Sequence, residues 1–156
     1  MPEQKSQAIA DLEKEMDTMS QYLVKTKNRP SQDAWLTEAG ADPSAEKIGM
    51  YLTHCGVVRG SAKALVRYGE AGTKPVAGMY FSYDEEKVER VIEETLALPG
   101  IYYLRVWLNS GELVLGDPIM QVMVGGDIRP HVIDGLQFLV GKIKNECVVE
   151  EETYKE

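Results

Sequence analysis

Residues 122–144 read VMVGGDIRPHVIDGLQFLVGKIK and carry the strongest structural signal in the chain. The first part continues an apolar, β-branched run that predicts a buried strand over residues 119–124, ended by two glycines. The second part spaces apolar residues by three and four, which predicts a helix over residues 131–145. The buried stripe of that helix consists of Val132, Ile133, Leu136, Leu139, Val140 and Ile143.

The junction between this strand and this helix contains Asp127, Arg129 and His131. Backbone N–H groups at a helix start favour anions, and a neighbouring cation strengthens that preference. The same residues can instead form a helix cap, because an aspartate accepts hydrogen bonds from the first free N–H groups. The sequence leaves both interpretations open: a site for a phosphate or carboxylate, or a capping cluster.

Outward from this centre, β-branched and aromatic segments bounded by glycine or proline predict further strands. A helix is expected over residues 84–96, with Ser82 and Glu85 as its capping pair, and a short helix over residues 33–39. Few strands are joined through a helix, so we expect an α+β fold with a mostly antiparallel sheet and packed helices. The predicted strands cover residues 48–54, 62–68, 76–82, 101–108 and 119–124.

The first 30 residues differ in pattern from the rest. Apolar residues between positions 3 and 25 form one narrow stripe, which predicts a docking helix. This helix packs on its own domain or a symmetry mate, or it binds a separate partner. Pro30 and its polar neighbours indicate a linker. We therefore divide the chain into an N-terminal amphipathic helix and linker, residues 1–30, and a domain of residues 31–156.

Composition limits the possible functions. The chain has 156 residues, 44% of them hydrophobic, and a formal charge of −8. One core is the expected architecture, and an acidic chain is a poor match for nucleic acid or an anionic membrane. Cys55 and Cys147 match no zinc or disulfide pattern, so we expect no metal site and a cytoplasmic location. We also expect no cofactor. His54 and Cys55 are adjacent on a strand and face opposite ways, with Cys55 expected in the core.

Two further cations attract attention. Arg59 lies in the turn CGVVRG after a strand, where its side chain is either solvated or aimed into a cleft. Lys144 lies near the end of the last helix, where it is either an exposed cap or a lysine with a depressed pKa. The segment SGELVLGDP, residues 110–118, predicts a turn, an edge segment and a second turn.

Three motifs in order, GVVRG, GELVLGD and the stretch over residues 122–144, resemble the large catalytic subunit of molybdopterin synthase. The resemblance extends over residues 34–152. It implies an α/β hammerhead-like fold, to which the N-terminal helix predicted here is an addition. It also implies a homodimer that becomes a heterotetramer by binding a small ubiquitin-like sulfur-carrier subunit at each end. The implied function is molybdenum cofactor biosynthesis: the carrier's C-terminal Gly-Gly thiocarboxylate gives sulfur to cyclic pyranopterin monophosphate, forming the dithiolene that later holds molybdenum.

The resemblance also implies site residues. Lys144 matches the first catalytic lysine, while Arg59 and Arg129 match arginines that hold anionic groups. Two positions depart from the pattern: Ile128 replaces the histidine of a His-Arg pair, and Glu151 replaces a second lysine in the tail. The candidate catalytic residue is Lys144, and the candidate substrate or anion-binding residues are Arg59, Arg129, His131 and Lys142.

These departures leave three hypotheses. In the first, the chain is an active sulfur transferase. In the second, it is a catalytically degenerate homologue that binds the carrier as a scaffold, because groups acting as a unit lose most of their effect when one is missing. In the third, His131 and Lys144 serve a different anion-binding or ligase-like activity.

Overall fold

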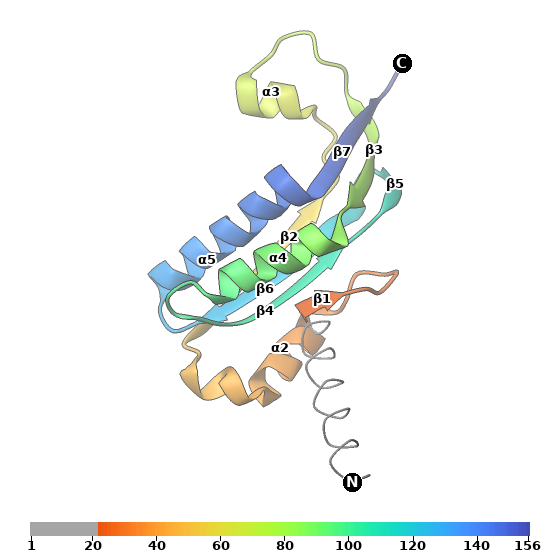
Figure 1. The fold of residues 1–156 in the computed structure, drawn as a ribbon. Coiled ribbons are helices and arrows are strands. Elements are labelled where there is room, and N and C mark those ends of the chain that lie inside the picture. Colours follow the sequence, from red (N-terminus) through yellow and green to blue (C-terminus); the bar gives the residue numbers. More distant parts are fainter. Residues whose placement is uncertain (1–21) are drawn as a thin grey trace.

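The computed structural model describes residues 22–156 and contains two sheets with helices packed on them (Figure 1). The elements are β1 (Leu23–Val24), α2 (Gln32–Ala41), the 3₁₀ turn η1 (Pro43–Lys47), β2 (Met50–Val57), α3 (Lys63–Tyr68), β3 (Val76–Tyr83), α4 (Glu85–Leu96), β4 (Ile101–Leu108), β5 (Gly111–Val114), β6 (Pro118–Gly126), α5 (Arg129–Lys142), the wide π turn η2 (Ile143–Cys147) and β7 (Val148–Tyr154). In the part of the chain that the structure describes, no helix is long and apolar enough to cross a membrane.

The sheets are mostly antiparallel. The larger sheet has the order β1-β4-β6-β2, and the smaller has the order β5-β3-β7. All neighbouring strands are antiparallel except β1, which pairs with β4 in parallel. The predicted α+β class with a mostly antiparallel sheet is confirmed.

Strand β6 forms the centre of the larger sheet. It pairs with β2 along one edge and with β4 along the other, and eight of its nine residues are buried. Its side chains alternate between two clusters: Val122 and Val124 belong to the one that includes side chains of α4 and α5, whereas Met123 belongs to the one that includes Trp35 of α2. Burial of each large apolar side chain contributes roughly 1.5–3 kcal/mol to folding, so both faces of β6 stabilise the domain.

The two glycines at the end of β6 permit close packing. A Cβ on Gly126 would collide with the carbonyl oxygen of Gly100, and one on Gly125 would press against the ring of Tyr51. These glycines therefore let the neighbouring chain segments approach the strand where it ends.

Most predicted elements are confirmed, but residues 62–68 were predicted as a strand and form helix α3. Ala, Lys, Leu and Arg are good helix formers, and Gly69 ends the helix in the left-handed conformation with φ of 65°. The N–H of Glu70 bonds back to the carbonyl of Ala64, as in a Schellman motif. The glycine that was expected to bound a strand is a helix cap.

Three boundaries also differ from the predictions. The proposed N-terminal helix lies mainly outside the described residues, but its last part is wrong because Leu23–Val24 forms a strand on the sheet. The cap of α4 is Asp84, whose carboxylate accepts the N–H of Lys87 at 3.1 Å, rather than the predicted pair Ser82 and Glu85. The last helix widens into η2 before residue 145, and β7 follows it unpredicted.

We predict that Gly100→Ala destabilises the domain more than Gly116→Ala does. Both glycines have positive φ, 77° and 82°, so each substitution meets the same backbone strain of about 1–2 kcal/mol. Gly116 has open space around it, whereas a Cβ on Gly100 would collide with Asp127 and His131. Urea unfolding of both variants should show the larger loss of unfolding free energy in Gly100→Ala. Equal losses would mean that the Asp127–His131 pair moves aside freely.

Candidate functional site

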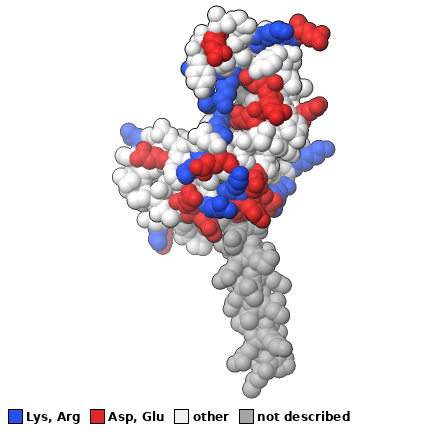
Figure 2. Space-filling view, turned by 45° about the horizontal axis from the view of Figure 1, so that its top comes forward, with Lys and Arg blue, Asp and Glu red and all other residues white. Residues whose placement is uncertain are grey.

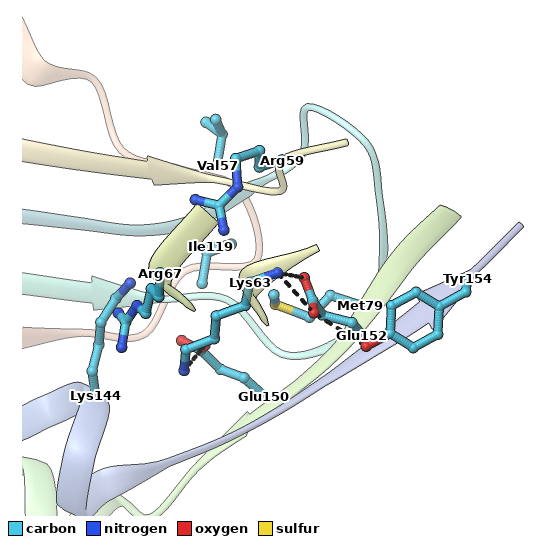
Figure 3. A pocket seen from close by; sticks show the side chains of 10 residues that line it. All are labelled: Val57, Arg59, Lys63, Arg67, Met79, Ile119, Lys144, Glu150, Glu152 and Tyr154. Atoms are coloured by element: carbon cyan, nitrogen blue, oxygen red, sulfur yellow. Dashed lines mark hydrogen bonds and ion pairs between the residues drawn. The ribbon is translucent and has the colours of Figure 1, made fainter. Parts of the chain in front are cut away.

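A cavity of about 200 Å³ opens between α3 and the two sheets (Figure 3). Its wall combines segments that are far apart in the chain: the end of β2 and the turn after it, α3, β3, β6, η2 and β7. The lining residues are Val57, Arg59, Lys63, Arg67, Met79, Ile119, Lys144, Glu150, Glu152 and Tyr154.

Two of the candidate site residues meet in this cavity. Arg59 follows β2 after a register shift between Gly56 and Val57, and its Nε donates to the carbonyl of Ser61 at 3.2 Å. Lys144 lies in η2, where the residue before it, Ile143, is buried. Wide helical turns of this kind recur at functional sites because they redirect a side chain. Arg59 and Lys144, 85 positions apart in sequence, therefore line the same cavity.

The sequence did not reveal two further cations in this cavity, Lys63 and Arg67 of α3. Their spacing of four residues puts them on one face of a helix, and the close view shows both beside the same hollow as Lys144 (Figure 3). On the predicted strand the two residues would also share a face, but roughly 13 Å apart at about 3.3 Å per residue, whereas on a helix they are neighbours. A helical assignment of residues 62–68 is the signal that could have found them.

Strand β7 contributes acidic groups to the same cavity. Both oxygens of Glu152 accept the backbone N–H of Lys63 at 3.1 Å, and the hydroxyl of Tyr154 donates to Glu152 at 3.2 Å. Glu150 Oε2 lies 3.9 Å from Lys63 Nζ. Because side chains alternate along a strand, Glu151 faces away from the cavity and is exposed. The position of the expected tail lysine therefore does not face the cavity.

The cavity is positively charged although the chain is acidic. Four cationic and two carboxylate side chains line it, an excess of two positive charges, whereas the whole chain carries −8. Figure 2 shows basic side chains gathered in the hollow beside the lobe at the top, with acidic side chains on the adjoining surface. A partly enclosed positive hollow binds an anion more strongly than open surface does.

At the junction before α5, Asp127 pairs with His131 and no side chain caps the helix, and Arg129 does not line the cavity within one chain. Asp127 Oδ1 accepts the N–H of Ile128 at 2.6 Å and lies 2.7 Å from His131 Nδ1. The hydrogen bond with His131 lowers the pKa of the Asp127 carboxyl. The Asp127 carboxylate is thus bound by Ile128 and His131, while the side chain of Arg129 is exposed.

Lys142 also lies outside the cavity. Its Nζ is 3.3 Å from Glu146 and 3.9 Å from Glu94, both partly exposed. Exposed pairs of this kind contribute little to stability, about 0–1 kcal/mol. Lys142 therefore interacts with carboxylates on the surface of α4 and η2 and does not line the cavity that contains Lys144.

His54 lies close enough to Lys144 to respond to its charge. Burial lowers the pKa of His54, and the Lys144 cation lowers it further. Its buried Nε2 has no hydrogen-bond partner among the described residues. Cys55, which was expected in the core, is instead exposed, with Sγ 3.6 Å from Gln121 Oε1. Over residues 22–156 no three His, Cys, Asp or Glu side chains group as metal ligands.

Three solved structures that share this fold are named for molybdopterin synthase, molybdopterin biosynthesis or the molybdopterin-converting factor. Molybdopterin synthase from Staphylococcus aureus matches with a TM-score of 0.62 at 15% identity, over 86% of this chain and 91% of that one. The molybdopterin biosynthesis MoaE protein from Burkholderia ambifaria matches with a TM-score of 0.62 at 19% identity, over 85% and 86%. A complex of subunits 1 and 2 of the molybdopterin-converting factor from Helicobacter pylori matches with a TM-score of 0.57 at 14% identity, over 86% and 90%.

These structural matches share the fold at low identity, and no curated individual protein matches the chain in sequence. The family model described as MoaE protein matches residues 26–146, which is most of the chain. The family inferred from the three sequence motifs is confirmed. The chain belongs to the MoaE family, that of the large subunit of molybdopterin synthase.

Proposed function

We propose that this chain is an active large subunit of molybdopterin synthase, which transfers sulfur from a thiocarboxylated small subunit to cyclic pyranopterin monophosphate. Membership of the MoaE family supports the coarser role, in molybdenum cofactor biosynthesis. The observation that carries the finer proposal is the meeting of Arg59 and Lys144 in one positive cavity.

The chemistry of a thiocarboxylate suits this cavity. When its carbon is attacked, negative charge develops on the carbonyl oxygen, and fixed cations at that place lower the barrier. Arg59 offers planar N–H donors to such an oxygen. Lys144 is held by a turn whose first and last residues, Ile143 and Cys147, are buried. It can therefore present its amine at a defined position as an acid or an amine at the reacting centre.

The partner in this reaction is a small sulfur-carrier subunit. The Helicobacter pylori structure with this fold is a complex of two subunits of the molybdopterin-converting factor. A C-terminal tail that ends in Gly-Gly is narrow, so it can enter a cavity of about 200 Å³ where a bulkier chain end could not.

A homodimer explains how Arg129 takes part. Arg129 and Lys144 are fifteen positions apart along α5 and η2, which corresponds to roughly 22 Å at about 1.5 Å per residue. Arg129 of one chain cannot line the cavity that its own Lys144 lines. In the proposed dimer, Arg129 of the partner subunit completes that cavity.

The alternative function is a carrier-binding scaffold without turnover. The observation that favours it is the pair Glu150 and Glu152 in the cavity, because carboxylates there oppose the binding of an anionic substrate. This scaffold would bind the small subunit and form no dithiolene.

We predict that Lys144→Met lowers the rate of molybdopterin formation by about 100-fold or more, because a positioned acid or base typically contributes that much. The assay mixes the protein with thiocarboxylated small subunit and cyclic pyranopterin monophosphate. Lys87→Met is the matched control, since Lys87 lies on α4 outside the cavity. Wild-type protein that binds the small subunit and yields no product would support the scaffold instead.

A second prediction concerns the dimer. Arg129→Ala and Lys144→Met should each be inactive alone, and mixing them should restore about a quarter of the sites, since half of the mixed dimers' sites carry neither change. The variants are unfolded and refolded together, and molybdopterin formation is measured. No recovery on mixing, although mixed dimers form, would place Arg129 and Lys144 at separate sites.

The third prediction concerns His54. Its pKa, followed by NMR of the ring protons, should lie below 6.5, because burial disfavours the charged ring. Lys144→Met should raise this pKa part of the way back, because the second cause of the shift is the charge of Lys144. A pKa unaffected by Lys144→Met would show that the two groups do not interact.

A further inference from the structure

We propose that Lys63 and Arg67 of α3 bind the phosphate group of the substrate and supply the positive charge that strand β7 does not. The nature of the ligand, a phosphate ester, rests on the proposed function. The placement of the two cations in the cavity does not depend on the proposed function, because it follows from the fold.

Both side chains line the same cavity as Arg59 and Lys144. Arg59 and Lys144 enter from the larger sheet and η2, while Lys63 and Arg67 enter from α3 (Figure 3). The substrate of the proposed reaction has two parts with different needs, a reacting ring and a phosphate. Cations that enter from different elements can contact these two parts at once.

Helix α3 is anchored well enough to hold a ligand. The carboxylate of Glu152 accepts the N–H of Lys63, and Ala62, just before the helix, is buried in the core. Past the helix the chain returns to the body, where the N–H of Val76 bonds to the carbonyl of Gly60 at 2.9 Å. The short excursion from Gly60 to Val76 is therefore closed at its base, and the two cations face a fixed wall.

Glu150 holds Lys63 near the cavity before the ligand arrives. The Glu150 side chain is only 14% exposed, and its Oε1 has no hydrogen-bond partner among the described residues. A carboxylate so placed is stable only beside positive charge. Lys63 Nζ lies 3.9 Å from Oε2 and has three N–H donors, so it can face Glu150 and still donate to a phosphate oxygen. Its side chain is 46% exposed, which leaves it accessible.

The charges on β7 explain why α3 is needed. Glu150, Glu152 and Tyr154 are the β7 residues that line the cavity, and none is a cation. A phosphate would meet repulsion from this strand. With Lys63 and Arg67 opposite, the cavity keeps its excess of two positive charges, and without them the excess disappears.

The test measures the binding of inorganic phosphate to the full chain by NMR, at constant ionic strength. The variant K63A/R67A removes both cations, and alanine at both positions favours the helix. K87A/R90A is the matched control, with the same change of charge on α4 outside this cavity. We expect the Kd for phosphate to rise about tenfold or more in K63A/R67A, the loss typical of removing a charged hydrogen bond, and to stay unchanged in K87A/R90A.

Equal weakening in both variants would show a general charge effect and overturn the proposal, as would no weakening in either. A second measurement uses the synthase assay, where K63A/R67A should raise KM for cyclic pyranopterin monophosphate and leave kcat within a few-fold. If wild-type protein forms no product, the proposed function fails, and the phosphate titration still decides whether Lys63 and Arg67 bind the anion. Single variants K63Q and R67Q, each expected to show part of the loss, guard against misfolding of the double variant.

Discussion

Strand β6 is buried on both faces and paired along both edges, and the positions of the other elements depend on this arrangement. A strand in this position has no free edge and no solvent face, so its register with β2 and β4 fixes where those strands end. Because β2 ends beside the start of β6, Arg59 emerges there. Because α5 packs over β6 and β2, the turn that contains Lys144 meets the same end of the sheet.

The cavity forms where structures of different kinds meet: the rim of the larger sheet, a short helix and a strand of the smaller sheet. The four cations of its lining come from three segments: the turn after β2, α3 and η2. Binding strength arises from the excess of positive over negative side chains around a partly enclosed volume, where solvent screens less than it does on open surface. An acidic chain can thus contain a site for an anionic substrate without a basic surface.

The sequence predicted the elements that have a clear period and the residues that lie in distinctive turns. The amphipathic patterns of α4 and α5 and the apolar run of β6 reflect local burial, and Arg59 and Lys144 follow from motifs. Helix α3 was misassigned because six residues hold too few turns to show a period, and its cap glycine also suits a strand end. Lys63 and Arg67 were missed for this reason. The position of Arg129 relative to the cavity could not be predicted, because a helical period does not show which end of the helix lies near a cavity.

The wide turn η2 affects two features of the site that would be independent of each other at the end of an ordinary helix. It orients Lys144, and it also sets which residues of β7 face inward, since the strand begins directly after it. Loss of one residue from this turn would exchange the two faces of β7, so that Val149 and Glu151 pointed inward and Glu150 and Glu152 outward. Where the lost residue precedes Lys144, the deletion would also rotate Lys144 about the helix axis. Length variation at this point of the chain is therefore far less tolerable than in the excursion that contains α3.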